Sequence, residues 1–297
     1  MGAVPDQPHV VAEIASQPDC WRRAAAAAGD HVASLPAPGE RVAVAGCGTS
    51  YFVAMSYASL REQAGHGTTD AFPASEFPTG RVYDRVVVIT RSGTTTEVLD
   101  LLERLRVPTV ALTGSAGTPV GAAADAVIEL GFADERAVVQ TRFATTVLAL
   151  LRAALGHDVE ALAADGERAL SAPLAGLDAE QVTFLGRGWT VGLAHEAALK
   201  LREAAGAWAE SYPAMEYRHG PISIAEPGRV VWMFGEPPNG LAGDVERTGA
   251  VFVHSDGTDP LAHLLLAQRL AVALAVRRGL DPDRPRNLAR SVIIDTA

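Results

Sequence analysis

Short apolar runs that alternate with helical stretches constrain the fold of this 297-residue chain more than any other feature. Residues 41–46 and 85–90 are two such runs, and each leads through a turn rich in glycine and hydroxyl side chains into a helical stretch. Similar runs lie at 107–113 and 126–131. A parallel sheet is covered by helices on both faces, so its strands are nearly continuous in apolar residues. The pattern predicts an α/β fold with parallel strands.

The same pattern restarts in the second half of the chain. Residues 181–190 repeat the strand, Gly-x-Gly and hydroxyl layout of residues 42–49, and they again lead into a helix. Strands are expected at 229–235 and 249–254, and a long helix at 260–279. Two sequential α/β units are the simplest interpretation, and one continuous doubly wound sheet is the alternative.

We therefore expect three segments. A helical lead-in spans residues 1–36, a first domain spans 37–165 and carries the phosphate-binding turns, and a second domain spans 166–297 and carries the acid-base residues and the C-terminal tail.

Composition limits the classes of protein to consider. Hydrophobic residues make up 48% and charged residues 20% of the chain, which is typical of a globular protein. No apolar stretch reaches the roughly 20 residues of a membrane span, and no secretory signal is legible. The two cysteines, Cys20 and Cys47, indicate neither a disulfide framework nor a metal site. We expect a cytoplasmic protein that uses no metal and no other cofactor.

The net charge of -10 argues against nucleic acid as a partner, so any anionic ligand must be held locally. Two turns could do this: Gly46-Cys47-Gly48-Thr49-Ser50 and Thr90-Arg91-Ser92-Gly93-Thr94-Thr95-Thr96. At the carboxyl ends of parallel strands, such turns and the helix N-termini behind them offer N–H and hydroxyl groups to a phosphate. The alternative is that these hydroxyls only cap the helices.

Lys200 is the only lysine in the chain, in a sequence that otherwise uses arginine for its cations. Glu196, Lys200 and Glu203 have the spacing of one helix face, flanked by Ala and Leu. An exposed ion-pair ladder would explain them, but so would an active site, because a buried ammonium can exchange protons whereas a guanidinium cannot. His219 precedes Gly-Pro, where a turn could present its imidazole at a cleft. A carboxylate and a histidine near a phosphate pocket suit sugar ring opening and proton abstraction beside a carbonyl.

Together these segments resemble the sugar isomerase (SIS) superfamily, most closely the isomerase half of glucosamine-6-phosphate synthase. The resemblance covers essentially the whole chain and is carried by Glu13-Ile-Ala-Ser-Gln17-Pro18, Gly46-Cys-Gly-Thr-Ser50, Ala74-Ser-Glu76-Phe77, Thr90-Arg-Ser-Gly-Thr-Thr95, Leu185-Gly-Arg-Gly188, Glu196-Ala-Ala-Leu-Lys200-Leu-Arg-Glu203, Glu216-Tyr-Arg-His219-Gly-Pro221 and Asp283-Arg-Pro-Arg-Asn-Leu-Ala-Arg290-Ser-Val292. It implies two tandem SIS domains, each a flavodoxin-like parallel sheet sandwiched by helices. It also implies a homodimer with shared active sites.

The resemblance assigns expected roles to individual residues. Glu203 matches the base that moves a proton between C1 and C2, and His219 matches a ring-opening residue supplied by the partner subunit. Lys200 matches a lysine that contacts the open-chain intermediate, where an ammonium can stabilise oxyanion charge. The expected phosphate contacts are Thr49, Ser50, Thr90, Arg91, Ser92 and Thr95, and other substrate contacts are Gly48, Val138, Gln140 and Arg290.

Three of these positions depart from the family pattern. Arg91 stands where glutamine is usual, Gln140 replaces a serine, and Arg290 replaces the lysine with which the synthase forms a Schiff base. Guanidinium is a very poor imine-forming group, so we expect no Schiff base through Arg290. No glutaminase domain precedes residue 1, so glutamine-dependent synthesis by this chain alone is not expected.

The expected function is that of a phosphosugar aldose-ketose isomerase acting on an amino sugar phosphate, and deaminating it as stand-alone glucosamine-6-phosphate deaminases do. Two alternatives remain at this point. One is a deglycase that removes an amine from a ketosamine phosphate, and the other is a non-catalytic phosphosugar sensor.

Overall fold

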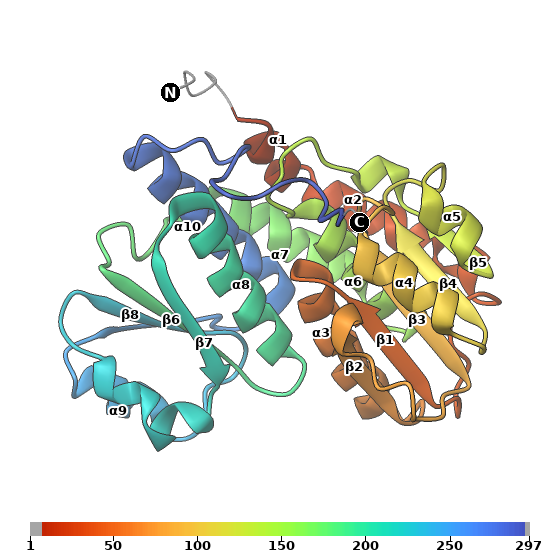
Figure 1. The fold of residues 1–297 in the computed structure, drawn as a ribbon. Helices are drawn as coiled ribbons and strands as arrows, with labels where there is room; N and C mark the ends of the chain where they lie inside the picture. Colours follow the sequence, from red (N-terminus) through yellow and green to blue (C-terminus); the bar gives the residue numbers. More distant parts are fainter. Residues whose placement is uncertain (1–7, 295–297) are drawn as a thin grey trace. The chain divides into compact units, whose positions relative to one another are not determined.

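The computed structural model of the protein describes residues 8–294, which fall into two compact units (Figure 1). A five-stranded unit comprises residues 19–135, 140–159 and 289–294, and a four-stranded unit comprises 8–18, 136–139 and 160–288. Residues 1–7 of the expected lead-in lie outside the described residues. From residue 9 the lead-in is helical, with α1 (His9–Ala15), α2 (Gln17–Ala27) and a 3₁₀ turn (Ala28–His31).

The five-stranded unit holds one parallel sheet in the order β2-β1-β3-β4-β5. Its strands are β1 (Val42–Gly46), β2 (Thr69–Pro73), β3 (Arg85–Thr90), β4 (Thr109–Thr113) and β5 (Ala126–Glu129). Its helices are α3 (Thr49–Gln63), α4 (Thr96–Arg104), α5 (Pro119–Ala123) and α6 (Arg142–Ala154). One face of the sheet packs on α4 and α5, while α3 and α6 pack on each other and α3 also packs on β1 and β3. The expected helix-covered parallel sheet is present.

The four-stranded unit holds a second, separate parallel sheet in the order β7-β6-β8-β9. Its strands are β6 (Gln181–Gly186), β7 (Trp208–Pro213), β8 (Arg229–Met233) and β9 (Val251–His254). Its further helices are α7 (Val159–Ser171), α8 (Thr190–Ala205), α9 (Leu241–Glu246) and α10 (Pro260–Arg277), with 3₁₀ turns at Glu216–His219 and Pro221–Ile224. The alternative of one continuous doubly wound sheet is therefore wrong.

Successive side chains of β8 point to opposite faces of the four-stranded sheet and contact different helices. Val231 and Met233 pack with Leu241 and Val245 of α9, whereas the ring of Trp232 lies 5.2 Å from the ring of His263 on α10. Helix α8 packs along α10 (Figure 1). Helix α8 also packs on β6 and β7, so it is buried on the sides that face the sheet and α10.

Helix α10 is the one described helix with the length and hydropathy of a membrane span, and 61% of that window is buried. It packs against α8 and α1 within its unit. This burial is that of a core helix.

Candidate active site

The turn after β1 is shaped by two glycines. A Cβ on Gly46 would lie 2.7 Å from the Cβ of Ser50, and Gly48 has a φ of 54°, which side-chain-bearing residues rarely adopt. This close approach places Thr49 and Ser50 in the first turn of α3, where both are buried. The turn after β6 in the four-stranded unit also requires a glycine at its start, since a Cβ on Gly186 would collide with the backbone of Thr190.

The turn after β3 gathers a second group of hydroxyls. Thr90 ends β3, Arg91 follows it, and both are buried; the Thr90 hydroxyl accepts a hydrogen bond from the Gly93 amide at 3.3 Å. Thr95 is the N-cap of α4, yet its side chain makes no capping hydrogen bond, and the N-cap of α3 is Gly48. Neither N-cap residue therefore supplies a capping hydroxyl, although within the turn the Ser92 hydroxyl accepts a hydrogen bond from the Thr94 amide at 3.3 Å. The N-terminus of a helix also favours an anion.

The C-terminal tail adds a hydroxyl that the sequence interpretation missed. The hydroxyl of Ser291 lies 3.1 Å from that of Ser92, 3.0 Å from that of Thr94 and 3.3 Å from that of Thr95. Backbone contacts hold the tail there, because the Thr96 amide donates to the carbonyl of Val292 at 3.1 Å. We call this group, Ser92, Thr94, Thr95 and Ser291, the hydroxyl cluster.

Two arginines flank the hydroxyl cluster. Arg91 is only 2% exposed and donates from Nη2 to the carbonyl of Arg290 at 2.9 Å. The guanidinium of Arg290 is directed to the carboxylate of Asp134, at 2.5 Å, and to the carbonyl of Glu135. Arg91 thus supplies a buried cation beside the cluster, while the side chain of Arg290 is engaged with protein groups.

Cys47 lies in the turn after β1 and is partly buried. Burial, with a smaller effect of Glu97, raises the pKa of its thiol to about 11. The thiol is therefore neutral at physiological pH, and only the thiolate is strongly nucleophilic. Within residues 8–294, no group of three or more His, Cys, Asp or Glu side chains could hold a metal ion.

Val138 and Gln140, the expected sugar contacts, fall in different units. The amide of Val138 donates to the carbonyl of Asp283 at 3.0 Å, within the four-stranded unit. In the five-stranded unit, Oε1 of Gln140 is buried and has no hydrogen-bond partner among the described residues. A buried amide oxygen without a partner is costly, and a donor on a ligand would satisfy it.

Three charged residues of α8, Glu196, Lys200 and Glu203, form an ion-paired cluster. The ammonium of Lys200, whose side chain is 1% exposed, lies 2.5 Å from Oε2 of Glu203 and 3.4 Å from Oε1 of Glu196. Glu196 is equally enclosed at 3% exposure, and Glu203 is the most open of the three at 18%. The alternative of an exposed ion-pair ladder is wrong. One buried and one half-buried carboxylate share the ammonium of Lys200, and this ion pair fixes the carboxylate of Glu203.

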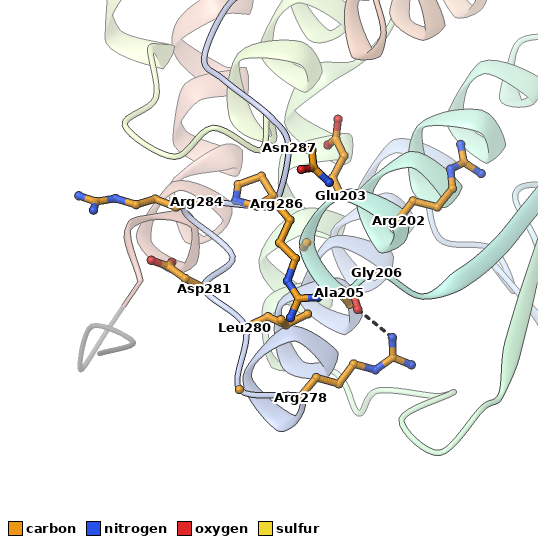
Figure 2. Close-up of a pocket in the computed structure, with 13 residues that line it drawn as sticks. Arg202, Glu203, Ala205, Gly206, Arg278, Leu280, Asp281, Arg284, Arg286 and Asn287 are labelled. Carbon is orange, nitrogen blue, oxygen red and sulfur yellow. Dashed lines mark hydrogen bonds between the residues drawn. The ribbon is translucent and has the colours of Figure 1, made fainter. Parts of the chain in front are cut away.

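Glu203 also lines a cavity of about 660 Å³, shown in Figure 2. The cavity is bounded by the end of α8, the end of α10 and the tail, and its lining residues are Arg202, Glu203, Ala204, Ala205, Gly206, Arg278, Gly279, Leu280, Asp281, Arg284, Pro285, Arg286 and Asn287. Asn287 lies beside Glu203 in this view. Glu203 thus combines an ion-paired carboxylate with an opening large enough for a small molecule.

His219 lies apart from this cluster. It ends the 3₁₀ turn Glu216–His219, is exposed, and makes no hydrogen bond or ion pair with any described residue. The glycine that follows has a φ of 137°, which ends the turn. The structure does not join His219 to Lys200 or Glu203, and its role stays a prediction.

The parallel sheet and the turns after β1 and β3 belong to a segment with a known family match. Residues 37–155 match the family model of the SIS domain. The chain thus contains a match to the SIS domain, and the whole of the β1–α3 and β3–α4 turns lies inside the matched region. The assignment of the four-stranded unit as a second SIS domain stays a prediction.

The chain is similar to curated enzymes over nearly all of its length. It is 30% identical to the glutamine–fructose-6-phosphate aminotransferase (isomerizing) of Pyrobaculum aerophilum, over 97% of this chain and 58% of that protein. It is also 30% identical to the enzyme of the same name from Sulfurisphaera tokodaii, over 86% of this chain and 50% of that protein. The chain therefore spans about half the length of the curated relatives that it matches.

Solved structures share the fold. The glucosamine-6-phosphate deaminase of Thermotoga maritima superimposes with a TM-score of 0.80 at 23% identity, covering 96% of this chain and 100% of that one. The tagatose-6-phosphate ketose/aldose isomerase of Escherichia coli also has a TM-score of 0.80, at 17% identity, covering 99% and 98%. At these identities the likeness concerns the fold.

Proposed function

We propose that the protein is a phosphosugar aldose-ketose isomerase that acts on an amino sugar phosphate and releases its amine. The observation that carries this proposal is the buried cluster on α8, in which Lys200 holds Glu203 at the edge of a cavity. A carboxylate with one fixed partner and access to a small molecule suits general acid–base catalysis.

In this proposal the turns after β1 and β3 bind the phosphate. The hydroxyls of Thr49, Ser50, Thr90, Ser92 and Thr95 donate hydrogen bonds to its oxygens, and Gly48 allows the backbone to come close. Arg91 contributes the positive charge, which a chain of net charge -10 must supply locally. Val138, Gln140 and Arg290 complete the list of proposed sugar contacts, and the unpartnered Oε1 of Gln140 supports its place there.

The proposed chemistry follows from the acid–base groups. His219 protonates the ring oxygen of glucosamine 6-phosphate and opens the ring. Glu203 then removes the proton from C2, Lys200 stabilises the negative charge that develops on the C1 oxygen, and Glu203 returns the proton to C1. The resulting imine at C2 adds water and expels ammonia, which leaves fructose 6-phosphate.

The names of similar proteins support this choice of substrate. An amino sugar phosphate or its ketose partner stands in the names of the aminotransferase relatives and of the Thermotoga maritima deaminase. The family pattern also includes a second subunit, and we propose a homodimer in which His219 serves the neighbouring active site.

Product analysis tests the proposal directly. Purified protein incubated with glucosamine 6-phosphate should yield ammonia and fructose 6-phosphate in equal amounts. Glu203→Gln should lower kcat by about 10²–10⁴-fold, the usual contribution of one general base. The absence of turnover across hexose and hexosamine phosphates, or a Glu203→Gln variant as active as the wild type, would overturn it.

A further inference from the structure

The position of His219 depends on the turn that carries it. Its imidazole makes no hydrogen bond or ion pair with any described residue, so the backbone of the 3₁₀ turn Glu216–His219 sets where it lies. A residue that transfers a proton must lie within hydrogen-bond reach of the atom that receives it. The turn therefore has to be held in place for His219 to serve the proposed ring opening.

Tyr217 anchors the inner side of this turn. Its side chain is fully buried and packs with Leu185, Met233 and Leu241 in the apolar core that β6, β8 and α9 share. Its ring centroid lies 6.3 Å from that of Tyr212 on β7. Helix α9 reaches the same core through Leu241, so it is a fixed support beside the turn.

Arg218 ties the outer side of the turn to α9. Nε of Arg218 donates to Oδ2 of Asp244 at 2.6 Å, and Nη2 donates to the carbonyl of Asn239, just before α9, at 2.8 Å. Nη1 lies 3.5 Å from the sulfur of Met215, which precedes the turn. Because a guanidinium is planar and rigid, bonds from all of its nitrogens fix its orientation, which an ammonium could not achieve.

We propose that Arg218 is a positioning residue for ring opening, and that its bonds to α9 hold the turn so that the imidazole of His219 reaches the ring oxygen. This inference rests on the proposed role of His219. Held by Tyr217 alone, the turn would be free to rotate about that side chain, and the contacts of Arg218 on the other side prevent this rotation. All three nitrogens of Arg218 are engaged by protein groups, so it acts through His219 and not on the sugar.

Arg247 provides a matched control. It pairs with the other oxygen of Asp244, but it stands at the C-cap of α9 and its side chain is 72% exposed. Among the described residues, Arg247 makes no hydrogen bond or ion pair with the turn Glu216–His219. Arg218→Gln and Arg247→Gln therefore remove the same charge from the same carboxylate, and only the first of them releases the turn.

A double-mutant cycle tests whether Arg218 acts through His219. It compares kcat and KM for glucosamine 6-phosphate in the wild type, Arg218→Gln, His219→Asn and the double variant. We expect Arg218→Gln to lower kcat by about 10- to 100-fold with little change in KM, the effect of a displaced catalytic group. The double variant should be as active as His219→Asn alone, because the position of the turn no longer matters without the imidazole. Arg247→Gln should keep the kcat of the wild type.

Hydrogen exchange measures the turn itself and needs no turnover. We expect the amides of residues 215–223 to exchange at least about tenfold faster in Arg218→Gln than in the wild type, and no faster in Arg247→Gln. Equal exchange in all three proteins would show that Arg218 does not hold the turn. If Arg218→Gln does not fold, Asp244→Ala removes the same bond and takes its place in both experiments, with the same expected results.

The outcomes separate this inference from the proposed function. If the wild type is active but the losses of Arg218→Gln and His219→Asn multiply in the double variant, Arg218 has a structural role alone, and the isomerase proposal stands. The inference is equally wrong if Arg247→Gln loses as much activity as Arg218→Gln. A wild type that does not turn over glucosamine 6-phosphate contradicts the proposed function first, and the role of Arg218 in ring opening falls with it.

Discussion

At the scale of single residues, the only lysine of the chain, Lys200, is the buried cation of the cluster on α8. Its burial could not be read from the sequence, because the same i, i+4, i+7 spacing occurs on solvated helices. The neighbouring Ala and Leu residues were the only signal. In the structure, Lys200 is the counter-charge of two enclosed carboxylates, Glu196 and Glu203.

Removing that counter-charge should destabilise the protein. We expect Lys200→Met to lower the free energy of unfolding by about 3–5 kcal/mol, since breaking a buried ion pair leaves carboxylate charge without compensation. Urea unfolding followed by circular dichroism measures this. The double variant Lys200→Met/Glu196→Gln should recover part of the loss, because it has one buried charge fewer. A loss below about 1 kcal/mol would mean that the carboxylates are solvated after all.

Ser291 is the residue that the sequence interpretation missed. It is about 200 positions from the turn that it contacts, and such a long-range contact leaves no local pattern. We expect Ser291→Ala to weaken the binding of inorganic phosphate about 3- to 10-fold, the effect of losing one hydrogen bond. Calorimetric titration with phosphate checks this. Tighter binding by the variant would show instead that Ser291 competes with the phosphate for the hydroxyl cluster.

At the scale of helices and strands, the sequence predicted the buried strands better than the edge strands. The apolar runs at β1, β3 and β4 are buried along nearly their whole length. Strands β2 and β7 were not predicted, and both lie at a sheet edge and are only partly buried. An edge strand has a neighbour on one side only, so its sequence, such as Thr-Asp-Ala-Phe-Pro in β2, need not be apolar throughout.

The contact between β8 and α10 should make stability depend on pH. Nδ1 of His263 accepts a hydrogen bond from Nε1 of Trp232 at 3.2 Å, and it lies 3.2 Å from the hydroxyl of Ser255. Burial, with a smaller effect of His254, lowers the pKa of His263 from 6.5 to about 4. Between these two values the unfolded chain binds the proton and the folded chain does not, so stability falls as the pH drops from about 7 to about 4.

The shift corresponds to about 3 kcal/mol at full protonation of the unfolded chain. Denaturant unfolding at pH 7, 5.5 and 4.5, for the wild type and His263→Gln, measures the contribution. The variant lacks the titrating imidazole, so its stability should decline less steeply over this range. If the free energy of unfolding falls equally with pH in both proteins, the acid sensitivity comes from groups other than His263.

At the scale of the whole molecule, the predicted feature with the largest consequence is the shared active site. Glu203 and His219 make no contact with each other in the described chain, and the resemblance to the SIS superfamily assigns His219 to the partner subunit. If this assignment is right, a dimer formed from one Glu203→Gln and one His219→Asn chain contains one intact site.

A subunit-mixing experiment tests this. Each variant alone should be nearly inactive, and an equal mixture refolded together should regain about a quarter of wild-type activity, because half of the dimers are mixed and each has one of two sites intact. If mass spectrometry shows that mixed dimers have formed but activity does not rise, the shared active site is contradicted.

The central claim is that Glu203 moves a proton between C1 and C2 of a bound phosphosugar. Proton NMR of glucosamine 6-phosphate and fructose 6-phosphate incubated with the protein in deuterium oxide observes that transfer at the carbon atoms themselves, whichever product is released. We predict deuterium at C1 or C2 with the wild type and at least a hundredfold slower incorporation with Glu203→Gln. No incorporation by the wild type, or equal rates in both proteins, would contradict the account.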